Sequence, residues 1–135
     1  MLLTKSERFP IRNQNDIVVV RQKVRIWATE MGFGLIDQTK VVTAASELAR
    51  NTLDYGGGGE MELAALKNDN QKPGLRLVFE DQGPGIPNVD LALTDGYTSG
   101  GGLGMGLSGS RRLMNEFKLE TEVGKGTRVT ITKWK

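Results

Sequence analysis

Apolar residues recur every three or four positions in two stretches near the start of the chain, and this spacing predicts two amphipathic helices. The first helix is expected to begin at a cap formed by Asn15 or Asp16 and to end near Gly32. The second is expected to run from a cap at Asp37 to about residue 53. The predicted buried faces comprise Ile17, Val20, Val24, Trp27 and Met31 in the first helix and Val41, Ala44, Ala45, Leu48 and Ala49 in the second.

Short apolar runs bounded by Gly, Pro and Asn predict strands in the rest of the chain. A strand over residues 6–12 contains Pro10, which has no amide donor and therefore favours the edge of a sheet. The other predicted elements are strands at 60–67, 75–81, 117–123 and 127–134, a helical turn at 89–94, a third helix at 103–116 and a hairpin turn at 124–126. Consecutive strands and clustered helices favour an α+β fold, a two-layer sandwich with helices on one face of a mixed, mostly antiparallel sheet. The length of 135 residues predicts a single domain, 1–135.

Composition excludes several kinds of chemistry. The chain has neither Cys nor His, which rules out a disulfide framework, a thiolate metal site, a Cys nucleophile, a Ser-His-Asp triad and a histidine phospho-acceptor. A net charge of +2 is too balanced for nucleic-acid binding by bulk charge. Charged residues interrupt the N-terminal segment and no apolar run approaches about 20 residues. We therefore expect no membrane span, no signal peptide and a cytoplasmic location.

Two polar clusters are candidates for a functional site. Glu47 and Asn51 lie four apart on the second predicted helix, where a carboxylate can act as a base and an amide oxygen can bind Mg²⁺. On spacing alone, a solvated polar face is the more frequent explanation of such a pair. Asp81 ends a predicted strand, and Gly83 and Gly85 follow it, so a flat ligand with an amino group could approach the backbone there. An ordinary Asp-x-Gly turn is the alternative.

Glycine is unusually frequent, 18 of 135 residues, where a typical protein has about 7%. The densest cluster, residues 98–109, leads into the third predicted helix and would offer free N–H groups and a positive helix end to a phosphate. A flexible linker is the alternative. Gly104, Gly106 and Gly109 fit the dinucleotide-binding pattern, but no strand precedes them, which disfavours a Rossmann fold. The P-loop pattern and the His-Arg-Asp and Asp-Phe-Gly motifs of eukaryotic-type protein kinases are absent.

In this order along the chain, Glu47-Leu48-Ala49-Arg50-Asn51, the run from Asp81 to Gly85, residues 102–107 and Gly126-Thr127 resemble the N, G1 and G2 boxes and the final Thr of the GHKL ATPase superfamily. The resemblance spans about residues 16–134 and implies a Bergerat fold. Because the chain is short, it is most similar to the bacterial anti-sigma-factor-type serine/threonine kinases, and among them to the switch kinases of the stressosome.

This resemblance implies that the protein binds Mg²⁺ and ATP. It assigns Glu47 as the catalytic base for a Ser or Thr hydroxyl, Asn51 as the Mg²⁺ ligand, and Asp81 and Thr127 as the residues that hold adenine. The implied ATP-binding residues are Asn51, Asp81, Gly83, Gly85, Gly102, Leu103, Gly104, Met105, Gly106 and Thr127. The chain departs from the superfamily in lacking a His after Asn51 and a Lys in the glycine loop. Arg50, Arg111 and Arg112 therefore remain alternative candidates for contacting the γ-phosphate.

The resemblance also implies protein partners: STAS-domain substrates that are stressosome components, and a PP2C-type phosphatase that the kinase then activates. It implies neither a nucleic-acid nor a membrane partner, and it is compatible with a homodimer. Arg21 and Arg25 lie four apart on the first helix, outside its apolar face, where the resembled family contacts its partner; a solvated face is the alternative. Two other functions stay open, an anti-sigma factor that sequesters a sigma factor and a non-catalytic nucleotide-binding scaffold, although intact Glu47 and Asn51 argue against the scaffold.

Overall fold

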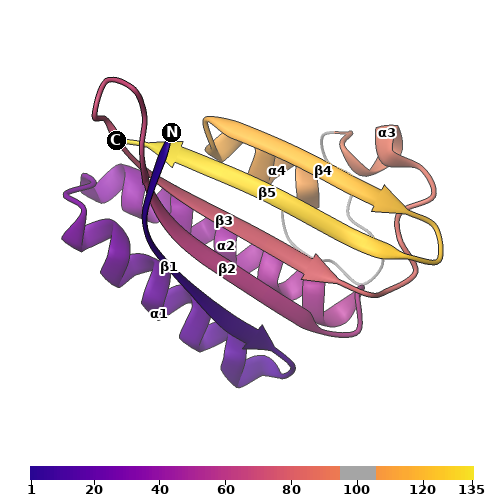
Figure 1. Ribbon diagram of the computed structural model, residues 1–135. Helices are drawn as coiled ribbons and strands as arrows, with labels where there is room; N and C mark the ends of the chain where they lie inside the picture. The colour runs from indigo at the N-terminus through magenta and orange to yellow at the C-terminus, as the bar shows by residue number, and fades with distance from the viewer. Residues whose placement is uncertain (95–105) are drawn as a thin grey trace.

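A computed structural model describes residues 1–94 and 106–135 and arranges them in two layers (Figure 1). The strands are β1 (Leu2–Ile11), β2 (Gly59–Lys67), β3 (Pro73–Asp81), β4 (Glu116–Glu122) and β5 (Gly126–Trp134). The helices are α1 (Gln14–Glu30), α2 (Leu35–Asp54), α3 (Val89–Ala92) and α4 (Gly106–Leu113). Figure 1 shows α1, α2 and α4 on one side of the sheet. The two-layer α+β architecture predicted from the sequence is confirmed.

The strands form one sheet in the order β1-β2-β3-β5-β4, and every pair is antiparallel. The register places Gly59, Asp81, Thr127 and Thr121 opposite one another in a single row across four strands. Residues that are far apart in the sequence thus meet where β3 ends, and this row forms one wall of the candidate site.

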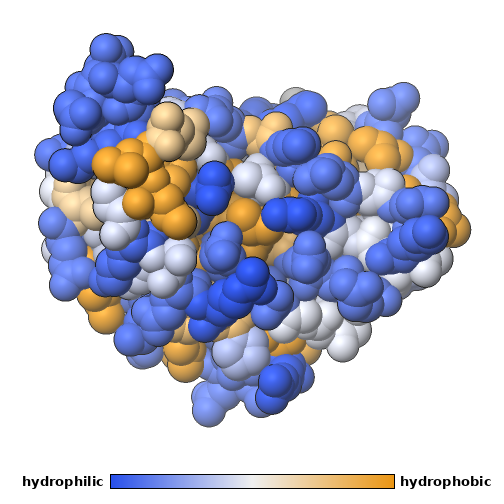
Figure 2. All heavy atoms as spheres, in the orientation of Figure 1, coloured by the Kyte–Doolittle hydropathy of each residue, from blue (hydrophilic) through white to orange (hydrophobic). Residues whose placement is uncertain are grey.

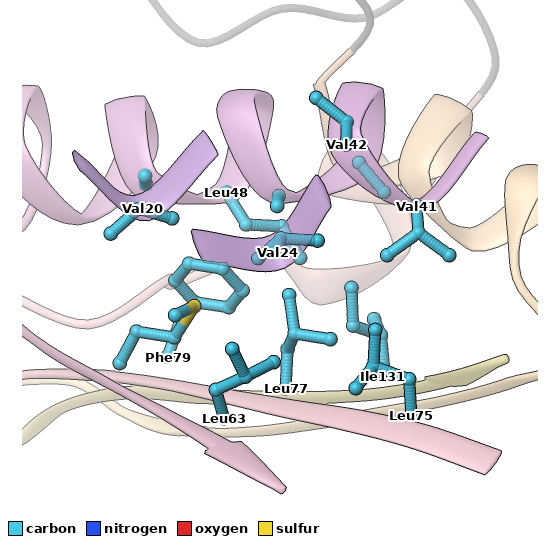
Figure 3. Close-up of a cluster of buried hydrophobic side chains, with 14 of the residues drawn as sticks. Val20, Val24, Val41, Val42, Leu48, Leu63, Leu75, Leu77, Phe79 and Ile131 are labelled. Atoms are coloured by element: carbon cyan, nitrogen blue, oxygen red, sulfur yellow. The ribbon is translucent and has the colours of Figure 1, made fainter. Parts of the chain in front are cut away.

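The core lies between the sheet and the two long helices. Leu63, Leu77 and Ile131 face each other across β2, β3 and β5 and are fully buried. Figure 3 shows these side chains meeting Val24 of α1 and Leu48 of α2. Each such side chain contributes roughly 1.5–3 kcal/mol when buried. This packing fixes α2 against the sheet, so the polar residues of α2 are held in a defined position.

The opposite face of the sheet is polar. In the orientation of Figure 2 the strands lie in front of α2, and hydrophilic side chains cover most of the visible surface. Arg8 approaches Glu60 at 2.7 Å and Glu62 at 3.7 Å, and Arg128 approaches Glu80 at 3.8 Å. Such exposed pairs add little stability. Within the described part of the chain, no helix combines the length and the apolar character needed to span a membrane.

Two predicted helix caps are wrong. The side chain of Asn13, rather than Asn15 or Asp16, caps α1 and accepts a hydrogen bond from the Asp16 amide at 3.0 Å. Asp16 instead lies in the first turn, where its carboxylate accepts from the amide of Arg12 at 2.8 Å. Asn13 and Asp16 can both accept backbone hydrogen bonds at the start of the helix. Asn13 is the cap because its side chain lies three residues before the amide of Asp16 and accepts from it.

The second helix begins at Leu35 after Gly34, with no side-chain cap. Asp37, the predicted cap, lies in the first turn, and one of its carboxylate oxygens is 3.8 Å from the Lys133 ammonium. An acidic side chain is stabilised in a first helical turn by the helix dipole without serving as the cap.

Other boundaries also differ from prediction. β1 begins at Leu2, four residues earlier than expected, while its position at the sheet edge agrees with Pro10. The last helix ends at Leu113 instead of continuing to residue 116. It ends early because Asn115 joins β5: its amide donates to the Thr132 carbonyl at 3.0 Å.

Candidate functional site

A cavity of about 200 Å³ opens between α2 and the ends of β3 and β5, with α3 and the start of α4 on its other side. Its wall is mainly apolar with a few polar groups, as is usual for small-molecule sites. The lining residues are Leu48, Asn51, Thr52, Tyr55, Phe79, Asp81, Ile86, Pro87, Asn88, Leu91, Ala92, Leu107, Thr127 and Val129. The cavity thus brings together Asn51, Asp81 and Thr127, three residues predicted as site residues from separate parts of the sequence.

Asp81 is the acidic group of this cavity, and its residue is only 8% exposed. Burial raises the pKa of its carboxyl group above the ordinary value of 3.8. Backbone amides of Gly83 and Thr127 donate to the carboxyl and oppose that rise in pKa, while the nearby charge of Glu80 adds to it. The Gly83 amide lies 2.9 Å from Oδ1. The carboxyl is therefore oriented by the backbone in a largely desolvated position.

Glycine backbone packs directly behind this carboxyl. A Cβ atom on Gly56 would lie 2.3 Å from Asp81 Cγ, and one on Gly83 would lie 2.7 Å from the Gly56 Cα. One on Gly126, whose φ is +103°, would lie 2.1 Å from the Asp81 carbonyl oxygen. Packing within the protein therefore requires these glycines. For Gly83 this is a different physical reason from the ligand approach expected from the sequence.

The segment after Asp81 is tied to its surroundings. Gly85 has φ of +75°, and a Cβ atom there would lie 2.3 Å from the Glu122 carbonyl oxygen. Its own carbonyl accepts a hydrogen bond from the Tyr55 hydroxyl at 3.0 Å, and the Pro84 carbonyl accepts from the Gly124 amide at 2.8 Å. The Gly-x-Gly turn is thereby fixed between the end of α2 and the β4–β5 hairpin.

Thr121 links the same segment to Thr127. Its Oγ1 accepts from the Ile86 amide at 2.9 Å, donates to the Gly126 carbonyl at 3.1 Å and lies 2.9 Å from the Thr127 Oγ1. Thr127 is 9% exposed and faces the cavity. The hydroxyl predicted to help hold the ligand therefore belongs to a defined hydrogen-bond network.

Beside the cavity, α2 carries two buried oxygens that lack a hydrogen-bond partner among the described residues: Oε2 of Glu47 and Oδ1 of Asn51. The other oxygen of Glu47 accepts from Arg50 Nη1 at 3.3 Å. Buried oxygens are nearly always hydrogen-bonded, so we expect water or a polar ligand to donate to these two atoms, which lie one helical turn apart. This arrangement disfavours a merely solvated helix face.

The chemistry of these oxygens suits a hard cation. Mg²⁺ prefers oxygen ligands and keeps several waters or phosphate oxygens, so a single amide oxygen such as that of Asn51 is sufficient. No group of three or more His, Cys, Asp or Glu side chains capable of holding a metal occurs in residues 1–94 and 106–135. A cation at this position would therefore depend on a bound phosphate for most of its ligands.

The predicted glycine loop lies only partly within the structure. Gly102, Leu103, Gly104 and Met105 fall outside the described residues, and Gly106 is the first residue of α4. After it, Leu107 lines the cavity, and Ser108 is 1% exposed with an Oγ that has no partner among the described residues. The start of α4 thus borders the cavity.

The predicted arginines do not line the cavity. Arg50 pairs with Glu47, and Arg111 Nη2 donates to the Leu93 carbonyl at 3.4 Å. Arg112 is exposed on α4. Arg21 and Arg25 are exposed on α1 and are likewise absent from the cavity wall.

Tyr55, Gly56 and Thr121 are among the residues of this site that the sequence did not predict. Tyr55 lies four positions after Asn51, so helical spacing could have placed it on the same face. Gly56 was interpreted only as part of a flexible break, and Thr121 gave no signal because its role depends on strand register.

Known proteins are similar to this chain over most of its length. A family model described as "Histidine kinase-, DNA gyrase B-, and HSP90-like ATPase" matches residues 36–135. The serine/threonine-protein kinase RsbT of Bacillus subtilis (strain 168) is 46% identical over 124 residues, which is 92% of each chain. An anti-sigma F factor of Clostridium kluyveri is 30% identical over 93% of this chain and 89% of its own length.

Solved structures support the fold. The crystal structure of the RsbU and RsbW domains of Rv1364c from Mycobacterium tuberculosis superposes with a TM-score of 0.65 at 22% identity, covering 96% of this chain and 32% of that one. The present chain therefore corresponds to about a third of that protein. The SiaB–SiaC complex from Pseudomonas aeruginosa gives a TM-score of 0.56 at 13% identity, covering 98% of this chain and 91% of that one.

The family match covers most of the chain, and the kinase relative is similar over almost all of it. The predicted relationship to GHKL-type serine/threonine kinases, and with it the expected enzyme class, is confirmed, and an ATPase domain of this kind implies the use of ATP. The chain belongs to the histidine kinase-, DNA gyrase B- and HSP90-like ATPase family.

Proposed function

We propose that this protein transfers the γ-phosphoryl group of ATP to a Ser or Thr hydroxyl of a STAS-domain regulator in a bacterial stress-signalling partner switch. Residues 1–135 would act as one kinase domain. The observation that carries the proposal is the pair of unsatisfied buried oxygens on Glu47 and Asn51 beside a cavity that ends at a buried Asp81. The proposal is also supported by the 46% identity to a serine/threonine-protein kinase over 92% of both chains.

In this proposal the cavity holds the adenine ring. The Asp81 carboxylate accepts a hydrogen bond from the adenine amino group, and the apolar wall of Leu48, Phe79 and Val129 packs against the ring. Thr127 lies opposite Asp81 in the sheet and contributes its hydroxyl. A hydrogen bond to a charged acceptor contributes about 1.5–3 kcal/mol, which makes Asp81 the main determinant of base recognition.

Towards the catalytic end, Asn51 would hold Mg²⁺, which neutralises phosphate charge when bound. Glu47 lies one helical turn earlier and would take the proton of the substrate hydroxyl as its oxygen attacks the γ-phosphorus and ADP leaves. Phosphoryl transfer depends mainly on positioning and on stabilising charge, so a single carboxylate base is enough. The 3.3 Å contact with Arg50 orients Glu47 and leaves its Oε2 atom for the hydroxyl.

The residues that would enclose the phosphates come from the glycine loop. We propose that Gly102, Leu103, Gly104, Met105 and Gly106 wrap the triphosphate. Gly106 begins α4, so amides at this helix start would face the anion.

The experiment is phosphoryl transfer from radiolabelled ATP to STAS-domain proteins encoded near this gene. Label should appear on a Ser or Thr of one such protein, require Mg²⁺ and disappear with Glu47→Ala. Label on this chain alone, or on no STAS protein tested, would refute the proposed substrate class. Activation of a PP2C-type phosphatase can be assayed with the same proteins, by its rate with and without the kinase.

An anti-sigma factor is a second candidate, because relatives such as the Clostridium kluyveri protein, at 30% identity, carry that name. The two functions differ in their protein partner, because the kinase phosphorylates a STAS-domain protein whereas an anti-sigma factor binds a sigma factor. Co-purification with a sigma factor at stoichiometric ratio, without phosphoryl transfer to any STAS protein, would favour the anti-sigma function.

For the partner, we propose docking on the outer face of α1. Arg21 and Arg25 are exposed there beside Val18 and Ile26, which are 43% and 48% exposed. Basic groups next to exposed apolar side chains suit an acidic protein surface, since opposite charge raises the association rate.

A further inference from the structure

Four hydroxyl and backbone groups meet at the end of the β4–β5 hairpin, and their geometry restricts where one hydrogen can point. The Oγ1 atom of Thr121 lies within hydrogen-bond distance of three groups: the Ile86 amide at 2.9 Å, the Gly126 carbonyl at 3.1 Å and the Thr127 hydroxyl at 2.9 Å. Thr127 is one of the residues that line the cavity, and Thr121 is not.

A count of donors and acceptors assigns the direction of each bond. A hydroxyl has one hydrogen and two lone pairs. The Ile86 amide can only donate, so it occupies one lone pair of Thr121. The Gly126 carbonyl can only accept, and at 3.1 Å it is positioned to receive the Thr121 hydrogen. With the Thr121 hydrogen donated to that carbonyl, the remaining contact uses the second lone pair of Thr121, and Thr127 donates its own hydrogen to it.

We infer that Thr121 is a positioning residue: it takes the hydrogen of Thr127 and leaves the Thr127 oxygen as an acceptor only towards the cavity. This inference rests on the proposed ATP site. Asp81, opposite Thr127 in the sheet, is also an acceptor when ionised. The polar end of the cavity thus offers two acceptors side by side, an arrangement that selects a base with an amino group.

The consequence is a preference for a 6-amino over a 6-oxo purine. An adenine amino group has two N–H donors for these two acceptors, whereas the 6-oxo group of inosine triphosphate presents a further acceptor to them. Sites that hydrogen-bond a polar group reject a mismatched group strongly. Without the Thr121 hydroxyl, Thr127 can rotate and donate to a 6-oxo group, so the preference should weaken.

The test is calorimetric binding of ATP and inosine triphosphate to Thr121→Val, with Thr121→Ser as the variant that keeps the hydroxyl. Thr130→Val is a matched control because Thr130 projects from the other face of β5. We expect the ratio of ATP to inosine triphosphate affinity to fall about tenfold in Thr121→Val, comparable to one hydrogen bond, and to stay near wild type in the two controls. Loss of the Ile86 contact lowers the affinity for both nucleotides, so only the ratio reports on the Thr127 hydrogen.

The outcomes separate this inference from the proposed function. An unchanged ratio in a folded Thr121→Val, with ATP still bound by the wild type, would overturn the inference and leave the ATP site intact. Failure of the wild type to bind ATP would instead refute the site. In Thr127→Val, adding Thr121→Val should not change the ratio further, and an additive change would show that Thr121 does not act through Thr127.

Discussion

The substitution Gly56→Ala tests the packing behind Asp81. Gly56 follows α2 in the turn before β2, and its backbone lies against the Asp81 side chain. The added Cβ would meet Cγ at 2.3 Å and Oδ2 at 2.5 Å, where ordinary contacts begin at 3.4 Å. Because Asp81 is at the end of a paired strand, its backbone cannot retreat easily, and the carboxyl itself must move by about 1 Å.

The expected magnitude follows from what the carboxyl loses. A shift of that size breaks the hydrogen bond from the Gly83 amide or the one offered to the adenine amino group. A hydrogen bond to a charged group is worth about 1.5–3 kcal/mol, so ATP affinity should fall roughly 10- to 150-fold. Overpacking a well-packed site also costs about 1–3 kcal/mol of folding free energy.

The assay is ATP titration by calorimetry, together with denaturant unfolding of the ligand-free protein. Gly34→Ala is the control, because a Cβ there meets nothing within 4 Å. Combining Gly56→Ala with Asp81→Asn should cost little more affinity than Asp81→Asn alone, because both remove the same interaction. Wild-type ATP affinity in a folded Gly56→Ala would refute the geometry behind Asp81.

Three further predictions concern Asp81, the α2 residues Glu47 and Asn51, and Arg21 on α1. Asp81→Asn should lose roughly 2–3 kcal/mol of ATP binding by calorimetry. Because the pKa of Asp81 in the folded protein is raised above 3.8, its contribution to stability falls as the pH rises from 3.8 through that pKa. Ligand-free Asp81→Asn should therefore unfold at no lower temperature than the wild type at pH 7. A variant that both binds ATP more weakly and unfolds at a lower temperature would contradict this prediction. Glu47→Ala should reduce phosphoryl transfer roughly 10²–10⁴-fold while sparing ATP binding, whereas Asn51→Ala should weaken binding in a Mg²⁺-dependent way; transfer at the wild-type rate by Glu47→Ala would place the base elsewhere. Arg21→Ala should slow phosphorylation of the STAS substrate at low salt, where screening is weakest, and leave ATP binding unchanged; equal rates in the two proteins at low salt would return Arg21 to a solvated face.

The elements of the fold could be predicted because their periodicities are strong and local. Helix-spaced apolar residues such as Val20, Val24 and Leu48 do form the faces of α1 and α2 that meet the sheet. The order of strands could not be derived in the same way. β5 pairs between β3 and β4, and nothing in the local pattern of residues 127–134 indicates which neighbour its second edge will find. The cap of α1 was predicted wrongly for a related reason. Asn13 and Asp16 can both accept backbone hydrogen bonds, and the local sequence does not show which of them caps the helix.

The candidate site shows the same difference between residues in short motifs, which could be predicted, and residues placed by strand register, which could not. Asp81, Asn51 and Glu47 carry functional atoms in motifs of short range, and the structure brings the first two to one cavity with the third beside it. The supporting residues have no such motif. Gly56 and Thr121 matter only because register and chain crossing bring them against Asp81 and Thr127.

The way Asp81 is held explains why the glycines gather here. Burial that raises the pKa of a carboxyl group is unfavourable to the folded protein. Within residues 1–94 and 106–135 no cation pairs with Asp81, and the hydrogen bonds to its carboxyl come from backbone amides. The Gly83 amide donates to this carboxyl, and the Gly56 backbone lies against it where a Cβ atom would not fit. A Lys or Arg partner would have stabilised the carboxylate better, but it would also have occupied the acceptor atoms and introduced a donor that opposes an adenine amino group. In the proposed site the carboxyl keeps acceptor capacity beyond these amides, and the adenine amino group would supply the further donor.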